Sequence, residues 1–336
     1  MKKNSVNLFI GIILGIIFLF LWIKIVDWRE FFHYFSNFNL KFALLFSVFY
    51  VFAYFLRSLR WRLILFPIKK LSVGNAFMIF MNGLLINYLI PIRAGEIAKS
   101  IILKIKYNVR ISRSLPTIFI DKITDLFPII LIMILIPLIS VRLNTALFSI
   151  VVVLFLIFLF FIGFLFFSVN HQSLALKFLH TLLRIFPKKY RSAFENFFSQ
   201  FVEGMAIMKN RYRDVLLISL LTIFAVFSEA VYIFAVFKAF GANIGFIKIL
   251  FGYTLMNLTY ILPTPPAQIG SNQFMWVLIF SFALGVDENL TSAAIAFSHL
   301  LTSVWIFLLG GISLLALNIK FSDLVTRKNW KTEGVK

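Results

Sequence analysis

Apolar runs of about 20 residues, the length at which a helix crosses the hydrocarbon core of a bilayer, recur along the whole chain. Hydrophobic residues make up 61% of the 336 residues and charged residues 14%, which leaves no room for a large soluble domain. The sequence therefore predicts a single all-α integral membrane domain over residues 1–336. Six spanning helices are expected, at about residues 6–26, 40–66, 115–139, 146–169, 215–240 and 290–319.

Two further apolar stretches, 75–107 and 247–284, are interrupted near the middle by Pro and Gly, so each half is short for a complete crossing. Treated as re-entrant helical hairpins, they place 26 Lys or Arg on one side of the membrane and six on the other. This positive-inside distribution predicts a multi-pass protein of the cytoplasmic membrane with both termini in the cytoplasm. Two short complete helices per stretch would give the same topology.

The chain also contains a repeated pattern. Residues 44–60 and 216–232 are identical at six of 17 positions, with an offset of 172 residues. Tyr88 and Pro91 recur at the same offset as Tyr260 and Pro263. We expect one repeat at about 40–139 and a second at about 214–319, inserted in opposite directions. In inverted-repeat transporters the substrate site lies where the two copies meet.

Charged side chains within the predicted spans carry a cost of roughly 2.5–3.5 kcal/mol each or more, so they mark functional or tightly paired positions. Arg57 and Glu229 occupy equivalent positions of the two repeats, which would bring the opposite charges toward the pseudo-two-fold axis. One interpretation is an ion pair that lines a translocation path. The other is a protonated Glu229 in a helix–helix hydrogen bond.

Asp121 and Asp125 lie four residues apart and so share one helix face, while Lys122 points about 100° away from them. The expected partners of the two carboxylates are Arg57, Arg60, Arg62 and Arg93. The cluster is interpreted as orienting the arginines of a substrate site or, equally, as a structural salt-bridge cluster. An acid–base pair or a metal site is less favoured because no His lies nearby in the sequence.

The breaks of the two interrupted stretches are the strongest candidates for a binding site, because backbone groups freed there must be satisfied by protein or water. A helix that starts at such a break points its N–H groups at the cavity, which suits a phosphate, and Arg93 would add bidentate donors. Mere packing features are the alternative. The candidate substrate-binding residues are Arg57, Arg60, Asn87, Arg93, Gly95, Glu96, Asp121, Asp125, Glu229, Pro263, Gln268, Gly270 and Asn272.

Four motifs resemble the flippase-like family that forms the transmembrane region of lysylphosphatidylglycerol synthases. They are Arg57-Ser58-Leu59-Arg60-Trp61-Arg62, Asn87 through Glu96 with its Pro-x-Arg-Ala-Gly-Glu signature, Asp121-Lys122-x-x-Asp125, and Pro263-x-Pro265 followed by Ile269-Gly270. The resemblance covers residues 57–270 in matching order. It implies a protein that moves or handles anionic or polyprenyl-linked lipids.

The chain departs from the family pattern at the second break. Ala267 and Gln268 replace a Gly pair there, and Asn272 and Gln273 stand where the family has a Glu. The family's soluble aminoacyl-transferring domain has no counterpart before the chain ends, 17 residues after Ile319, so lipid lysylation by this chain alone is not expected.

A basic segment, 171–213, separates the two predicted repeats. Its Phe residues recur at three- and four-residue spacing among Lys and Arg, which predicts an amphipathic helix on the anionic inner leaflet. Its role is interpreted as a topology anchor or as a surface that feeds lipid headgroups toward the site.

The favoured function is movement of an anionic phospholipid or a polyprenyl-phosphate-linked lipid between leaflets. The alternatives are an intramembrane lipid-modifying enzyme and a membrane subunit that presents lipid to a separate transferase. The chain has no Cys, and neither a cofactor, a metal nor a nucleic-acid partner is expected. The sequence leaves the lipid, the energy source and the oligomeric state open.

Overall fold

The computed structural model describes residues 2–90, 94–125, 127–136, 211–259 and 265–325, with scattered positions between 148 and 181. These residues fold into helices joined by short connections. Three helical segments are long and apolar enough to cross a membrane: Leu40–Leu65, Tyr212–Ala239 and Glu288–Ala316. They correspond to the second, fifth and sixth of the predicted spans.

The helices of the first half are α1 (Lys2–Ile25), α2 (Trp28–Ser36), α3 (Leu40–Phe46), α4 (Val48–Leu65), α5 (Val73–Leu89), α6 (Ala94–Tyr107), α7 (Ile111–Thr124) and α8 (Pro128–Leu135). The second half contains α12 (Tyr212–Ala239), α13 (Phe246–Thr259), the 3₁₀ turn η3 (Pro266–Gln268), α14 (Ser271–Trp276), the π-helical turn η4 (Val277–Ala283), α15 (Glu288–Ala316) and α16 (Phe321–Val325). Polar side chains at several starts accept the first N–H groups, as Ser72 does for α5 and Asp287 for α15.

Helices α4 and α12 form the centre of the fold and run antiparallel. The N–H of Asn39 donates to the Ala239 carbonyl at 2.9 Å near one end of the pair, and Arg211 donates to the Leu63 carbonyl at 3.0 Å near the other. Between these ends Ala53 and Ala225 are buried in one small apolar cluster. Small residues at a helix crossing let the backbones approach closely, as is common between membrane helices.

Each of the two interrupted stretches is a pair of helices with a break between them. Helices α5 and α6 pack on each other, and a side chain at Gly95 would collide with the carbonyl of Gly83. In the second stretch, α13 is followed by η3 and α14, and Gly270 has a φ of 78°. A Cβ at Gly270 would meet the backbone of α1, so this position requires Gly for both reasons.

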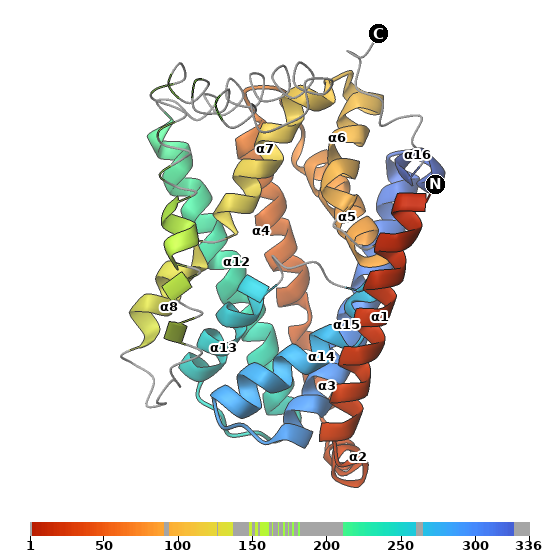
Figure 1. The fold of residues 1–336 in the computed structure, drawn as a ribbon, viewed down its shortest axis with the longest axis vertical. Helices are drawn as coiled ribbons and strands as arrows, with labels where there is room; N and C mark the ends of the chain where they lie inside the picture. Colours follow the sequence, from red (N-terminus) through yellow and green to blue (C-terminus); the bar gives the residue numbers. More distant parts are fainter. Residues whose placement is uncertain are drawn as a thin grey trace.

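Figure 1 places α5 and α6 in the upper half of the molecule along its long axis and α13 and α14 in the lower half. The largest apolar cluster includes residues of α12, α13, η4 and α15, and a second cluster joins α5 and α6 to the end of α4.

The remaining predicted spans are described only in part. The third is divided: α7 ends at Thr124 and α8 begins at Pro128, whose ring nitrogen has no N–H to continue the helical hydrogen bonds. The first is helical over Lys2–Ile25, of which Gly15–Ile25 forms a shorter apolar helix. Half of the fourth span, and most of the segment 171–213 in which the amphipathic helix is expected, lie outside the described residues.

Candidate functional site

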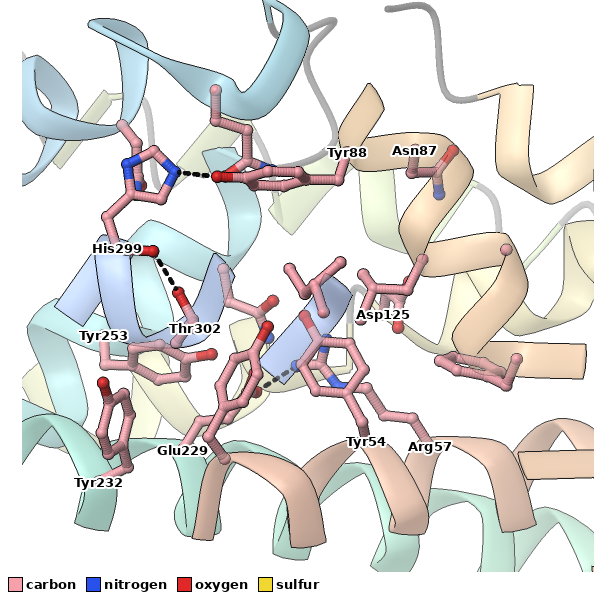
Figure 2. A pocket seen from close by; sticks show the side chains of 18 of the residues that line it. Tyr54, Arg57, Asn87, Tyr88, Asp125, Glu229, Tyr232, Tyr253, His299 and Thr302 are labelled. Carbon is pink, nitrogen blue, oxygen red and sulfur yellow. Dashed lines mark hydrogen bonds and ion pairs between the residues drawn. The ribbon is translucent and has the colours of Figure 1, made fainter. Parts of the chain in front are cut away.

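A cavity of about 420 Å³ lies between the central helices and the two interrupted stretches (Figure 2). Its walls come from α4, α5, α6 and α7 in the first half and from α12, α13, η3, α14 and α15 in the second. Eight of the 13 predicted site residues line it: Arg57, Arg60, Asn87, Glu96, Asp125, Glu229, Gln268 and Asn272.

Arg57 and Glu229 form an ion pair, as their repeat positions predict. Nη2 of Arg57 lies 2.5 Å from Oε2 of Glu229, and only 13% and 4% of the two side chains are exposed. The guanidinium also lies 5.3 Å from the centre of the Tyr54 ring, at cation–π distance. Figure 2 shows this pair at the floor of the cavity, where α4 and α12 meet.

Six further charged side chains form a closed circuit of alternating charge, here called the charge ring. Arg60 bonds to Asp121 (2.8 Å) and Asp125 (2.7 Å), and Lys99 to Asp121 (3.4 Å) and Glu96 (2.7 Å). Lys122 closes the ring through Glu96 (2.8 Å) and Asp125 (3.0 Å). Three cations and three carboxylates from α4, α6 and α7 thus neutralise one another, which a low-dielectric surrounding requires.

The shared helix face of Asp121 and Asp125 is confirmed, since both carboxylates accept from Arg60. Two other expectations were wrong. Lys122 does not point away from the pair, because its long stem carries the ammonium one turn forward along the helix to Asp125. Arg57 and Arg62 do not pair with the two carboxylates: Arg57 is held by Glu229, and Nε of Arg62 donates to the Leu71 carbonyl at 2.7 Å.

The second half contributes a series of neutral hydrogen bonds, here called the neutral chain, from Gly270 through Gln273, His299 and Tyr88 to Ser303. The Gly270 N–H donates to Oε1 of Gln273 at 2.9 Å, and Nε2 of Gln273 lies 2.9 Å from Nδ1 of His299. Nε2 of His299 lies 3.1 Å from the Tyr88 hydroxyl, which also bonds to Ser303. This chain joins the end of α5 to α14 and α15.

Three predicted residues support the cavity from behind. Asp121 is fully buried and holds Arg60 and Lys99. Gly95 donates its N–H to the Asn87 side chain at 2.8 Å, and Gly270 lies against α1. Arg93 and Pro263 lie outside the described residues, so their predicted roles stay predictions.

Sequence reasoning missed several residues of the cavity. Lys99 follows Glu96 by three residues, a spacing that signals a helical ion pair. His299 and Tyr232 had no local signal, because their partners are far away in the chain. The missed lining tyrosines are Tyr50, Tyr54, Tyr232 and Tyr253. In the described part of the chain, no cluster of three His, Asp or Glu has the geometry to hold a metal ion.

Comparison with known proteins gives one family. The family described as Lysylphosphatidylglycerol synthase TM region matches residues 8–311, which is most of the chain. No curated protein and no solved structure matches.

Proposed function

The chain belongs to the family of the lysylphosphatidylglycerol synthase TM region, and from this premise we propose that it moves a lipid between membrane leaflets. The favoured cargo is an anionic phospholipid or a polyprenyl-phosphate-linked lipid. The observation that carries the proposal is the cavity, because both interrupted stretches line it and bring charged and hydrogen-bonding groups among apolar helices. Irregular backbone and charge at membrane depth are typical of transport sites.

An inverted repeat of two units, about 40–139 and 214–319, is supported by the helix boundaries. Shifted by 172 residues, α4 falls on α12, α5 on α13, α6 on η3 with α14, and α7 with α8 on α15. The packing of the helices shows the same correspondence: α4 packs on α5 and α7, while α12 packs on α13 and α15. Likewise α6 packs on α7 and α14 on α15. The antiparallel contact of α4 with α12 is what a two-fold axis in the membrane plane would produce.

Within this scheme each interrupted stretch is a re-entrant hairpin, and six helices span the cytoplasmic membrane with both termini inside. The packing of α5 on α6 supports the hairpin in the first repeat. The offset also relates Glu96 to Gln268, and both side chains line the cavity. The two hairpins would therefore present equivalent positions to the cargo from opposite sides of the membrane.

The cargo's phosphate would bind by replacing a carboxylate as the partner of a cation, rather than by entering a site of unpaired positive charge. Four cations of the described residues line the cavity, and each is already paired with a carboxylate. Arg57 is the best exchange partner, since its bond to Glu229 uses Nη2 and a guanidinium has five N–H donors. A phosphate that bonds Arg57 would weaken its bond to Glu229, at the contact between the two repeats. Arg93 would add donors at the first break.

The test is a leaflet-accessibility assay in proteoliposomes. Fluorescent phosphatidylglycerol and a fluorescent polyprenyl phosphate are the probes, and dithionite quenching reports the label left outside. We expect protein-dependent movement of at least one probe. A folded protein that moves neither probe would contradict the proposal.

Charge substitutions at the repeat contact sharpen the test. Arg57→Glu should slow movement by about tenfold or more, because two carboxylates would then share a buried site. Arg57→Glu combined with Glu229→Arg should restore part of the rate. Arg29→Glu, on the exposed α2, is the matched control and should keep the native rate. Full activity of both Arg57→Gln and Glu229→Gln would exclude the pair from the mechanism.

A further inference from the structure

His299 is a buried titratable side chain that the lipid-movement proposal leaves without a role. It lies in α15, 8% exposed, and lines the cavity together with Gln268 and Asn272. Its imidazole contacts the second interrupted stretch through Gln273 and the first through Tyr88. Figure 2 shows the ring pointing across the cavity to the Tyr88 hydroxyl. A group in this position can sense both stretches at once.

The hydrogen bonds of the neutral chain fix the protonation state of this imidazole. The Gly270 N–H needs an acceptor, so the Gln273 side chain offers it Oε1 and turns its NH₂ group toward His299. An NH₂ group only donates, and Nδ1 of His299 must therefore accept. The remaining proton sits on Nε2, which donates to the Tyr88 hydroxyl. His299 is thus neutral, in the Nε2–H form, in this conformation.

A second partner is available to a protonated ring. The backbone carbonyl of Ala267 in η3 lies near the His299 side chain. A carbonyl only accepts, so it can bond an imidazole N–H and cannot bond a bare ring nitrogen. His299 therefore stands between a donor, the Gln273 amide, and an acceptor, the Ala267 carbonyl. These two partners suit its neutral and its protonated state respectively.

The backbone around Ala267 is strained. Ala267 and Gln268 have φ angles of 52° and 56°, in the left-handed region that residues with a Cβ rarely adopt. One residue, Ile269, separates them from Gly270, whose own φ is 78°. Strain of this kind often marks segments that change conformation in function.

We propose that His299 is the proton-binding site of this protein and that protonation moves its Nδ1 bond from Gln273 to the Ala267 carbonyl. The proposal rests on the proposed lipid movement, for which it supplies a coupling ion. The step is a proton transfer: a hydronium ion gives its proton to the Nδ1 lone pair, so that one O–H bond breaks, one N–H bond forms, a water molecule is released and the ring gains one positive charge. Gln268 and Asn272 flank the exchanged partners, so proton binding would reshape the neutral side of the cavity.

The other titratable groups near His299 are few in the described elements that pack on α15. Tyr88 faces it from α5, and Tyr232 from α12 bonds the neighbouring Ser298 carbonyl. Neither α14 nor η4 contains a titratable side chain. Those of α2 lie near the start of α15, where Glu30 bonds Asn289. Glu229 shares the cavity but is neutralised by Arg57, so the added charge stays on His299.

The first experiment reads the protonation state directly. The chain has four His, so a variant with His33, His171 and His180 changed to Gln leaves His299 as its single imidazole. Solid-state NMR of the ¹⁵N-His-labelled variant in phosphatidylglycerol vesicles should show the neutral Nε2–H form at high pH and an imidazolium on acidification. An Nδ1–H form at high pH, or a ring that stays neutral down to about pH 4, would overturn the proposal.

The second experiment reads the cavity. Because the chain has no Cys, Gln268→Cys gives a single thiol, and its labelling rate by a methanethiosulfonate reagent reports access to the neutral side. The exposed Phe32→Cys variant is labelled in parallel, to correct for the change of thiolate content with pH. The corrected labelling rate of Gln268→Cys should change about threefold or more between about pH 8 and pH 5. Adding His299→Gln should remove this change, whereas the matched control His33→Gln should keep it. A pH response that survives His299→Gln would refute the inference.

A gain-of-charge variant keeps the test decisive if His299→Gln folds poorly. Gln273→Glu places a carboxylate, which only accepts, against Nδ1 and should keep a proton on Nδ1, either as the imidazolium or as the neutral Nδ1–H form. Its NMR signal near pH 8 should then show a protonated Nδ1, and a ring that keeps the bare Nδ1 of the native protein would overturn the proposal. Neither readout needs lipid movement. Absent movement with an intact His299 response therefore rejects the proposed function, while movement without that response rejects the proton site.

Discussion

The two sides of the cavity keep polar groups among apolar helices by different means. On the first-half side, the charge ring joins six ionised side chains of α4, α6 and α7, and every one has two oppositely charged partners. On the second-half side, the neutral chain links α5, α14 and α15 through an amide, an imidazole and hydroxyls. The same cavity therefore has one charged wall and one neutral wall.

This difference indicates which of the two walls can change its protonation state and conformation. Removing one member of a buried ion network leaves its partners uncompensated, so the charge ring is expected to be rigid and to stay ionised. The neutral chain contains a group that can gain a proton and a strained segment beside it. We therefore expect the charged wall to support the fold and the phosphate site, and the neutral wall to respond to conditions.

The largest effect should come from opening the charge ring. Asp121→Leu removes a fully buried carboxylate, so Arg60 and Lys99 each lose one of their two charged partners. The substitution should lower the free energy of unfolding by about 3–5 kcal/mol. Thermal unfolding of the purified protein in detergent measures it. The control is Asp214→Asn, which removes a partly exposed pair with Arg211 and should cost at most about 1 kcal/mol. Equal losses would mean that the ring is not a structural unit.

An intermediate effect is expected where the charged wall depends on close helix packing. Gly95→Ala forces a Cβ into the carbonyl of Gly83 and should push α6 from α5, at a cost of about 1–3 kcal/mol. Glu96 and Lys99 lie in α6 and would be displaced with it, so the rate of lipid movement should fall as well. Gly74→Ala on the same hairpin has open space around it and should be neutral or slightly stabilising. Similar stability of the two variants would show that the close contact is dispensable.

The smallest effect should come from the neutral wall. Tyr88→Phe removes the hydroxyl between His299 and Ser303 and should lower the free energy of unfolding by only about 1–2 kcal/mol, since both partners are uncharged. Tyr212→Phe, at an exposed position, is the matched control and should have no measurable effect. A loss as large as that of Asp121→Leu would remove the distinction between the two walls.

Much of the fold could be predicted from local sequence. Apolar length marks the helical segments Leu40–Leu65, Tyr212–Ala239 and Glu288–Ala316, and Pro and Gly mark the interrupted stretches. The pairing of Arg57 with Glu229 was also predictable, because a repeat read from the sequence relates the two positions. The division of the third span at Pro128 was missed, since apolar composition continues through the break.

By itself, then, the sequence determined the membrane class, the breaks and which charges must find partners, because apolar length and the cost of a bare charge in lipid are local properties. Only the tertiary structure decided which partner each charge takes. In the folded chain Lys122 pairs with Asp125 in the charge ring, and Arg62 donates to a backbone carbonyl. His299 lies between Gln273 and Tyr88 and is hydrogen-bonded to both. These choices depend on helices that are distant in sequence, and ion pairs and hydrogen bonds form only within a few ångströms.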